Sequence, residues 1–237
     1  MITKRVLSMM LIGGLAGSMA FTMTAHATSL TPGSLLNIPP TVIDTLSGSP
    51  GTLIDSSTTT ITTSSFSASI REAVFTPSGI PNTTDYYFQV VNAPGSSDAI
   101  GRVTDRSFDL FTTNVFLRTD NAGGGGSAGF TASTIAPIGI DRDISGQTVG
   151  WNFEKGASPA LAPGSTSEIL VVRVNSPSFS TNGQFNAIDG AVGSTASFAP
   201  EEPRSIPSVP EPASVLLLGT GLAGLAIVVR RRYSRQD

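Results

Sequence analysis

The chain contains no cysteine, and several other residue types are confined to its ends. All five methionines and the only histidine lie within the first 26 residues, and Lys155 is the only lysine after Lys4. Without cysteine, no disulfide can hold the fold together. Because no histidine follows His26, Ser-His-Asp and Cys-His catalysis lack their base in the rest of the chain. Zinc, copper, haem and iron–sulfur centres lack their usual nitrogen and sulfur ligands, so we expect no cofactor.

Basic residues are also scarce in the middle of the chain. Residues 28–209 hold eight Lys and Arg against fifteen Asp and Glu, a net charge of −7, whereas the whole chain has −3. An acidic domain without a basic cluster argues against binding of DNA, RNA or anionic polysaccharide through charge. Neutral glycans and divalent cations remain as ligands.

The N-terminus has the order of parts of a secretory signal peptide. Lys4 and Arg5 precede an uncharged run, Val6 to Phe21, and Ala25 and Ala27 form an A-x-A cleavage site. We therefore expect residues 1–27 to be a signal peptide for the Sec export machinery, removed to leave Thr28 first. An uncleaved N-terminal anchor is the alternative. The lack of cysteine excludes lipoprotein attachment.

The C-terminus also consists of three parts. Val209, Pro210, Glu211 and Pro212 are followed by 17 uncharged residues, 213–229, and then by Arg230, Arg231 and Arg232. A helix of that length covers about 25 Å, the short end of what crosses a hydrocarbon core. The arginines would stop transfer and hold residues 233–237 in the cytoplasm. A plain single-span anchor is the alternative to a processed signal.

These parts, in this order and at this end, resemble the PEP-CTERM sorting signal over residues 209–232. The resemblance implies recognition by an exosortase, a membrane-embedded protease or transpeptidase that removes the helix near Pro210–Pro212. It further implies transient residence in the inner membrane of a Gram-negative bacterium. The mature protein is then expected at the cell surface or in an exopolysaccharide matrix.

The region between the two signals has the pattern of an all-β protein. No segment carries a sustained 3.6-residue apolar stripe, and short apolar segments recur between Gly, Pro, Asn and Asp turns. We expect an antiparallel β-sandwich or jelly roll over residues 66–198, followed by a Pro-rich linker, 199–208. Predicted strands lie at 66–75, 86–91, 99–104, 107–111, 114–118, 148–153, 168–175 and 196–198.

Two of these segments permit finer predictions. Residues 168–175 are apolar on both faces, which indicates a central strand. In residues 66–75 the alternation changes phase, which suggests a bulge. Residues 28–65 are rich in Ser, Thr and Pro, as in an O-glycosylated stalk, but a Thr-rich edge strand or loop is the preferred interpretation.

Three kinds of site merit testing in the structure. Asp141 and Asp143 are two apart, as calcium ligands can be, although Arg142 between them favours ordinary turn residues. Trp151 with Tyr86, Tyr87 and Phe153 would suit sugar stacking, although a β core demands the same residues and is preferred. Glu72, Glu154 and Glu168 leave a carboxylate-based glycan hydrolase open, without a local motif to support it. The sequence therefore favours a non-enzymatic surface or matrix protein, with a calcium- or glycan-binding module as the alternative.

Overall fold

The computed structural model describes residues 28–38, 44–122, 128–154 and 161–201, and every named element in them is a strand. The strands are β1 (Thr28–Ser29), β2 (Leu35–Asn37), β3 (Thr52–Thr62), β4 (Ser67–Thr76), β5 (Thr84–Asn92), β6 (Arg102–Arg106), β7 (Thr113–Arg118), β8 (Gly139–Arg142), β9 (Thr148–Asn152), β10 (Ile169–Val174), β11 (Ser178–Asp189) and β12 (Ala191–Glu201).

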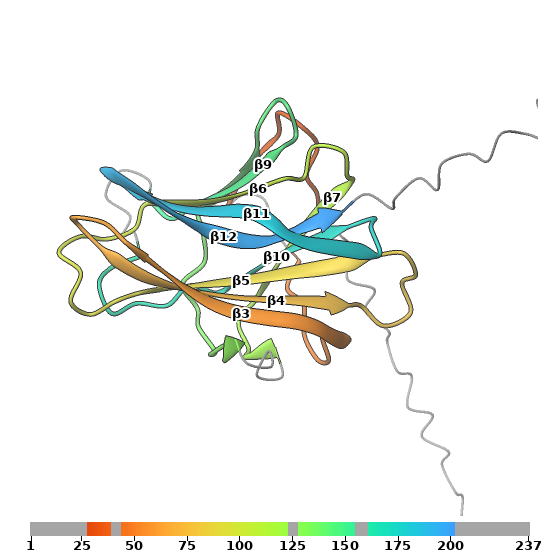
Figure 1. Ribbon diagram of the computed structural model, residues 1–237, viewed down its shortest axis with the longest axis horizontal. Coiled ribbons are helices and arrows are strands. Elements are labelled where there is room, and N and C mark those ends of the chain that lie inside the picture. Colours follow the sequence, from red (N-terminus) through yellow and green to blue (C-terminus); the bar gives the residue numbers. More distant parts are fainter. Residues whose placement is uncertain (1–27, 39–43, 123–127, 155–160, 202–237) are drawn as a thin grey trace, which may run out of the picture.

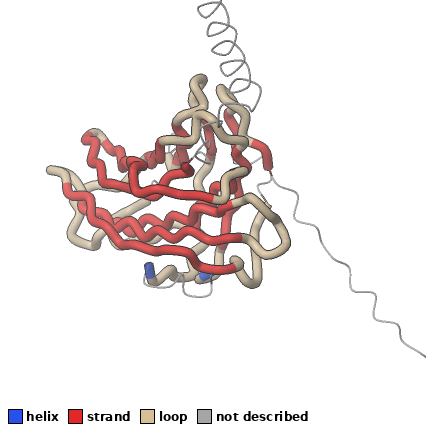
Figure 2. The backbone as a smooth tube through the Cα atoms, turned by 45° about the vertical axis from the view of Figure 1, so that its right-hand side comes forward, coloured by secondary structure: helices blue, strands red, loops and turns tan. Residues whose placement is uncertain are grey.

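The strands form two six-stranded sheets that pack face to face (Figures 1 and 2). Sheet A has the order β1-β7-β10-β5-β4-β3, and sheet B has the order β12-β11-β6-β9-β8-β2. Every pair of neighbouring strands is antiparallel. The all-β class and the antiparallel sandwich expected from the sequence are thus confirmed.

The main core lies between the two sheets and follows from the period-two alternation of the strands. Ile70 and Val74 of β4, Leu170 and Val172 of β10, and Trp151 of β9 are all fully buried in it. Aromatic rings meet across the layers: the ring centroids of Phe88 and Trp151 are 6.0 Å apart. Because no disulfide is available, this apolar contact between sheets is the principal source of stability.

A second, smaller apolar cluster covers the outer face of sheet A. Tyr87, Phe116 and Val171 point away from the main core and pack under Phe130, which lies between β7 and β8. Strand β10 is therefore buried on both faces and lies between β7 and β5. The central position predicted for residues 168–175 is confirmed.

The same two-sided burial corrects the prediction of a bulge in residues 66–75. Strand β4 pairs with β5 in unbroken register from Ala68 to Phe75. The apparent change of phase arises because Val74 faces the main core while Ala73 and Phe75 face the outer cluster. The register shift in this part of the sheet lies in the neighbouring strand β3, between Leu53 and Asp55.

The boundary predicted at residue 66 is wrong, because sheet strands begin at Thr28. Strands β1 and β2 pair with β7 and β8, and β3 pairs along its length with β4. Strand β3 is the edge of sheet A, so the edge-strand interpretation of the Thr-rich segment is confirmed in preference to a stalk.

The other differences between the predicted and the observed strands occur at a turn and at strands with polar residues. Residues 107–111 form a turn instead of a strand, with Ser107 at a φ of 95°. Strands β8 and β11 were not predicted at all. Strand β12 extends to Glu201, so the linker expected from residue 199 starts later.

No helix in the described residues is long and apolar enough to cross a membrane. The predicted transmembrane helix, 213–229, and the signal peptide, 1–27, lie outside the described residues.

Candidate functional site

The described surface carries a small polar pocket over the outer face of sheet A, which we call the outer pocket. It encloses about 130 Å³. Its floor is made by side chains from three adjacent strands, β5, β10 and β7, and its mouth by the segments before β3 and after β4. The lining residues are Leu46, Ser47, Ser49, Pro50, Pro77, Ser78, Ile80, Asp85, Tyr87, Arg118 and Arg173.

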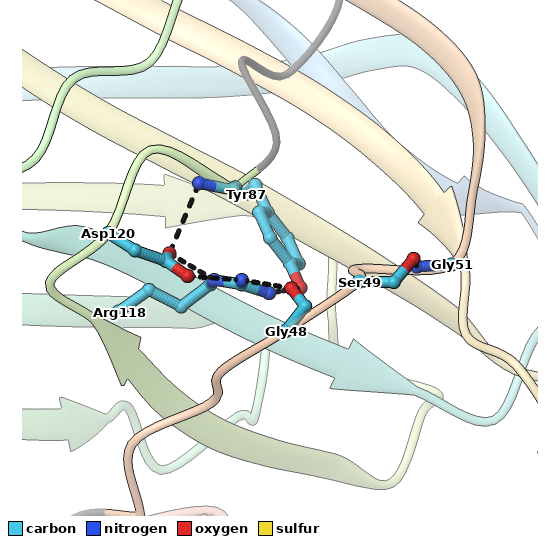
Figure 3. A network of polar contacts seen from close by, with 7 residues as sticks. Gly48, Ser49, Gly51, Tyr87, Arg118 and Asp120 are labelled. Atoms are coloured by element: carbon cyan, nitrogen blue, oxygen red, sulfur yellow. Dashed lines mark hydrogen bonds and ion pairs between the residues drawn. The ribbon is translucent and has the colours of Figure 1, made fainter.

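Arg118 is the most highly connected group of the pocket (Figure 3). Its side chain is only 1% exposed, and it donates from Nε and Nη2 to the two oxygens of Asp120, each at 2.7 Å. Nη1 donates to the Tyr87 hydroxyl at 3.2 Å, and Nη2 donates to the Gly48 carbonyl at 2.6 Å. Arg118 thereby fastens the loop before β3 to the sheet.

These contacts determine the charge states of Arg118 and Tyr87. Burial alone would lower the pKa of Arg118, but its hydrogen bonds to Asp120 and Tyr87 raise it. Burial raises the pKa of Tyr87 to about 12, against the opposing effect of Arg118. Arg118 is therefore charged and Tyr87 neutral at any physiological pH.

A second ion pair lies beside the first. Arg173 donates from Nε and Nη2 to the two oxygens of Asp85, at 2.6 and 2.7 Å, across the β10–β5 register. Burial raises the pKa of Asp85, and the hydrogen bond from Arg173 opposes that rise. The Arg173 guanidinium also lies 4.8 Å from the ring centroid of Phe116, a cation–π distance.

The outer pocket is therefore polar but close to electrically neutral. Each of its two arginines is paired with an aspartate: Arg173 with Asp85 in the lining, and Arg118 with Asp120 beside the pocket. Three serines also line the pocket. Within the described residues, Nη1 of Arg173 and the hydroxyl hydrogen of Tyr87 have no acceptor. Such a set of adjacent donors and acceptors matches neutral hydroxyl groups better than it matches an ion.

A second polar group lies inside the main core, between the sheets. Glu72 of β4 and Asp105 of β6 are 1% and 0% exposed. Glu72 Oε2 accepts from the Phe198 N–H at 3.3 Å, and Asp105 Oδ1 accepts from the Ser197 hydroxyl at 2.7 Å. The remaining oxygens, Glu72 Oε1 and Asp105 Oδ2, are buried without a partner among the described residues.

Burial controls the protonation of both acids. It raises the pKa of Glu72 to about 8, with a smaller opposing effect of the Phe198 N–H. It also raises the pKa of Asp105 well above its usual value, and the nearby charge of Glu72 raises it further. This buried acid pair is enclosed in the core, where a polymeric substrate has no access.

The two aspartates proposed as calcium ligands have other partners. The Asp141 carboxylate accepts two hydrogen bonds from Arg102, at 2.5 and 2.7 Å, and one from Asn152 at 2.9 Å. The Asp143 carboxylate accepts from the Thr148 N–H and the Ser145 hydroxyl. Burial alone would raise the pKa of Asp143, but these hydrogen bonds lower it. No metal-binding group of three or more ligands occurs in the described ranges.

Arg142, between the two aspartates, points into the protein and is 3% exposed. Its five donated hydrogen bonds go to oxygens of uncharged groups: the carbonyls of Leu30, Phe108, Phe111 and Gly146, and the hydroxyl of Thr113. Burial lowers its pKa, while the charges of Asp143 and Asp109 oppose that effect. Arg142, whose charge argued against a calcium loop, therefore has a structural role, because it joins these segments by hydrogen bonds.

The aromatic residues considered for sugar stacking and the glutamates considered for catalysis do not form one common site. Trp151, Tyr86 and Phe153 lie in the main core, so the core interpretation of these residues is confirmed. Tyr87, in contrast, lines the outer pocket. Glu154 is exposed, whereas Glu168, next to β10, is buried, and that burial raises its pKa. Among the three glutamates, only Glu72 affects the pKa of Asp105. Glu154 and Glu168 are not part of the buried acid pair.

The sorting residues fall outside the described ranges. They are Ala25 and Ala27 at the predicted signal cleavage site, Val209, Pro210, Glu211 and Pro212 at the sorting motif, and Arg230, Arg231 and Arg232 after it. The sequence predicts these residues but gave no indication of the outer pocket. The signal for the pocket was weak, because Tyr87, Arg118 and Arg173 lie far apart in the chain.

Comparison with known proteins bears on the C-terminus. Residues 208–232 match the model of the PEP-CTERM protein-sorting motif. No curated protein and no solved structure matches the chain significantly. The motif indicates an exported precursor that is anchored in the membrane and sorted to the cell surface. The chain therefore carries a PEP-CTERM sorting motif and is of the kind that an exosortase processes.

Proposed function

We propose that the mature protein is a non-enzymatic component of the cell surface or of an extracellular, polysaccharide-containing matrix. The observation that carries this proposal is the sorting motif at residues 208–232, downstream of an antiparallel sandwich. The arrangement of the polar groups supports it. The acid pair Glu72 and Asp105 is enclosed in the core, and Arg142 is used to hold loops together.

Intact mass of the protein recovered from the matrix of its host tests the sorting step. We expect a product that starts near Thr28 and lacks residues 213–237. Glu211→Ala should cause retention of the precursor in the membrane, whereas Glu202→Ala, in the same tail but outside the motif, should be processed normally. A matrix product that still carries residues 213–237 would contradict the proposal and leave a plain membrane anchor.

A second candidate function is a binding module for neutral glycans, because the outer pocket offers adjacent donors and acceptors without net charge. Three serine hydroxyls at its mouth add groups that sugar hydroxyls can pair with. The pocket volume of about 130 Å³ limits the bound part to about one sugar unit.

Ligand-observed NMR with neutral monosaccharides at millimolar concentration tests this candidate. Ser49 is exposed at the pocket mouth, so Ser49→Leu should block the entrance without disturbing the core. Ser97→Leu, at an exposed position outside the pocket, is the matched control. Saturation transfer that is equal in both variants, or undetectable in the native protein, would remove the outer pocket as a glycan site.

A further inference from the structure

Strand β3 has a long edge without a strand partner among the described residues. Sheet A ends at β1, which has two residues, and at β3, which has eleven. Sheet B ends at β2, with three residues, and at β12, with eleven. Short edges offer few backbone groups to another strand, whereas a long edge is a template for pairing.

The backbone register shows which groups of β3 face outward. The Thr63 N–H donates to the Phe66 carbonyl, so Thr63 and Phe66 form a hydrogen-bonded pair. In an antiparallel ladder such pairs alternate with non-hydrogen-bonded pairs, so Thr62, Thr60 and Thr58 are non-hydrogen-bonded toward β4. Their N–H and C=O groups therefore point to the free edge. None of these backbone groups has a partner among the described residues.

This edge lacks the features by which proteins usually protect edge strands. The ten residues 56–65 read SSTTTITTSS, without a charge, a proline or a glycine. Asp55 and the register shift beside it lie at the N-terminal end of the strand, away from the central threonines. Strand β12, in contrast, contains Gly193 and Pro200 and ends at Glu201.

We propose that β3 pairs with β3 of a second copy of this chain, antiparallel and about a two-fold axis at Thr60. In that register Thr60 lies opposite Thr60 of the second copy, and Thr58 lies opposite Thr62. These three residue pairs bring the outward groups of both strands together and form about six backbone hydrogen bonds. The two A sheets then become one continuous sheet.

The residue pattern favours a second copy over an unrelated strand. The segment is nearly the same when read in either direction, so an antiparallel pair of copies matches threonine with threonine and Thr59 with Ile61. β-Branched residues paired across strands stabilise a sheet. Residues 28–209 carry a net charge of −7, which makes two copies repel each other over most of their surface. The edge of β3 is uncharged, so two copies can approach each other there without this repulsion.

Cross-linking of the full chain in detergent tests the register directly, because the chain has no cysteine of its own. Opposed residues in a hydrogen-bonded pair have Cα atoms about 5.5 Å apart, within the range of a disulfide, about 4.4–6.8 Å. Thr60→Cys should therefore form a disulfide-linked dimer under mild oxidation. Ile54→Cys, exposed on the same strand, is the matched control, since its two copies would lie about 40 Å apart.

Sedimentation velocity on two further variants separates pairing from chance contact. Thr60→Lys places like charges opposite each other and should weaken self-association at least tenfold, whereas Thr60→Val keeps the backbone ladder and should associate as the native chain does. Thr60 is exposed, and circular dichroism will verify that all variants keep the native β-sheet signal.

Several outcomes would overturn the proposal. These are a native chain that is monomeric at every concentration, equal cross-linking at positions 54 and 60, and a Thr60→Lys variant that associates as the native chain does. A monomer that acquires a strand from another protein also counts against it. None of these outcomes affects the processing of residues 213–237, so failure here is distinguishable from failure of the sorting proposal.

Discussion

The buried acid pair makes stability depend on pH in a direction that one substitution should abolish. Glu72 is 1% exposed, and burial raises its pKa from 4.5 to about 8. Below pH 4.5 the carboxyl group is protonated in both the folded and the unfolded chain. Between pH 4.5 and about 8 the unfolded chain ionises while the folded chain does not, so stability falls as the pH rises. Above about pH 8 both states are ionised, and Glu72 causes no further change.

The size of the effect follows from the pKa difference. A rise from 4.5 to about 8 corresponds to about 5 kcal/mol of unfolding free energy lost across that range. Asp105 acts in the same direction, because its pKa is also raised by burial. Glu72→Gln removes the contribution of Glu72 and keeps an oxygen that can accept from the Phe198 N–H.

Urea unfolding from pH 4.5 to pH 9, followed by the fluorescence of Trp151, measures the effect. Trp151 is the only tryptophan and is fully buried, so its emission reports on the core. We expect Glu72→Gln to match the native protein near pH 4.5 and to exceed it by several kcal/mol, at most about 5, at pH 9. Glu154→Gln, at an exposed position, should follow the native curve. Parallel curves for the native protein and Glu72→Gln would refute this reasoning.

Three further predictions concern other parts of the domain. Trp151→Ala should cost about 3–5 kcal/mol in denaturant unfolding, since the side chain is fully buried, and loss of glycan retention without loss of stability would contradict its place in the core. Arg142→Lys should cost about 3 kcal/mol, because an ammonium group with three donors leaves buried oxygens unpaired, and a loss below about 1 kcal/mol would show that these hydrogen bonds matter little. The melting temperature should be the same with and without millimolar calcium, because Arg102 and Asn152 already occupy the Asp141 carboxylate, and a rise of several degrees would restore the calcium site.

The apolar pattern of the sequence was sufficient to predict several strands closely, although it missed the buried strand β8. Strands β5, β7, β9 and β10 all fell within a few residues of the expected bounds. Strand β11 was missed because Asn182, Gly183 and Gln184 interrupt its apolar pattern, and its place in the sheet is determined by pairing with β12 and β6. Residues 107–111 have a suitable composition for a strand, but the positive φ of Ser107 turns the chain there.

The polar groups were harder to place, because their partners lie far away in the chain. Glu72 meets Asp105 only when sheets A and B stack, and no local spacing indicates that pairing. Arg118 and Arg173 look like scattered charges in the sequence, yet the β7–β10–β5 order brings them to one pocket. The sorting motif was predictable because its parts are contiguous.

The pairing of the first two strands has a consequence for the order of events during export. Strand β1 pairs with β7 and β2 pairs with β8, while the Leu30 carbonyl accepts from Arg142. If residues 1–27 act as the predicted signal peptide, residues 28–38 are the first part of the domain to cross the membrane, and we expect them to have no strand partner until residues up to Arg142 have crossed. During that interval the peptide bond after Ala27 adjoins unpaired chain, which is the form that a signal peptidase requires. We therefore expect late folding of the N-terminal edge to leave the predicted cleavage site accessible to a peptidase, and a signal-cleavage rate that is insensitive to slowed translocation would argue against this order.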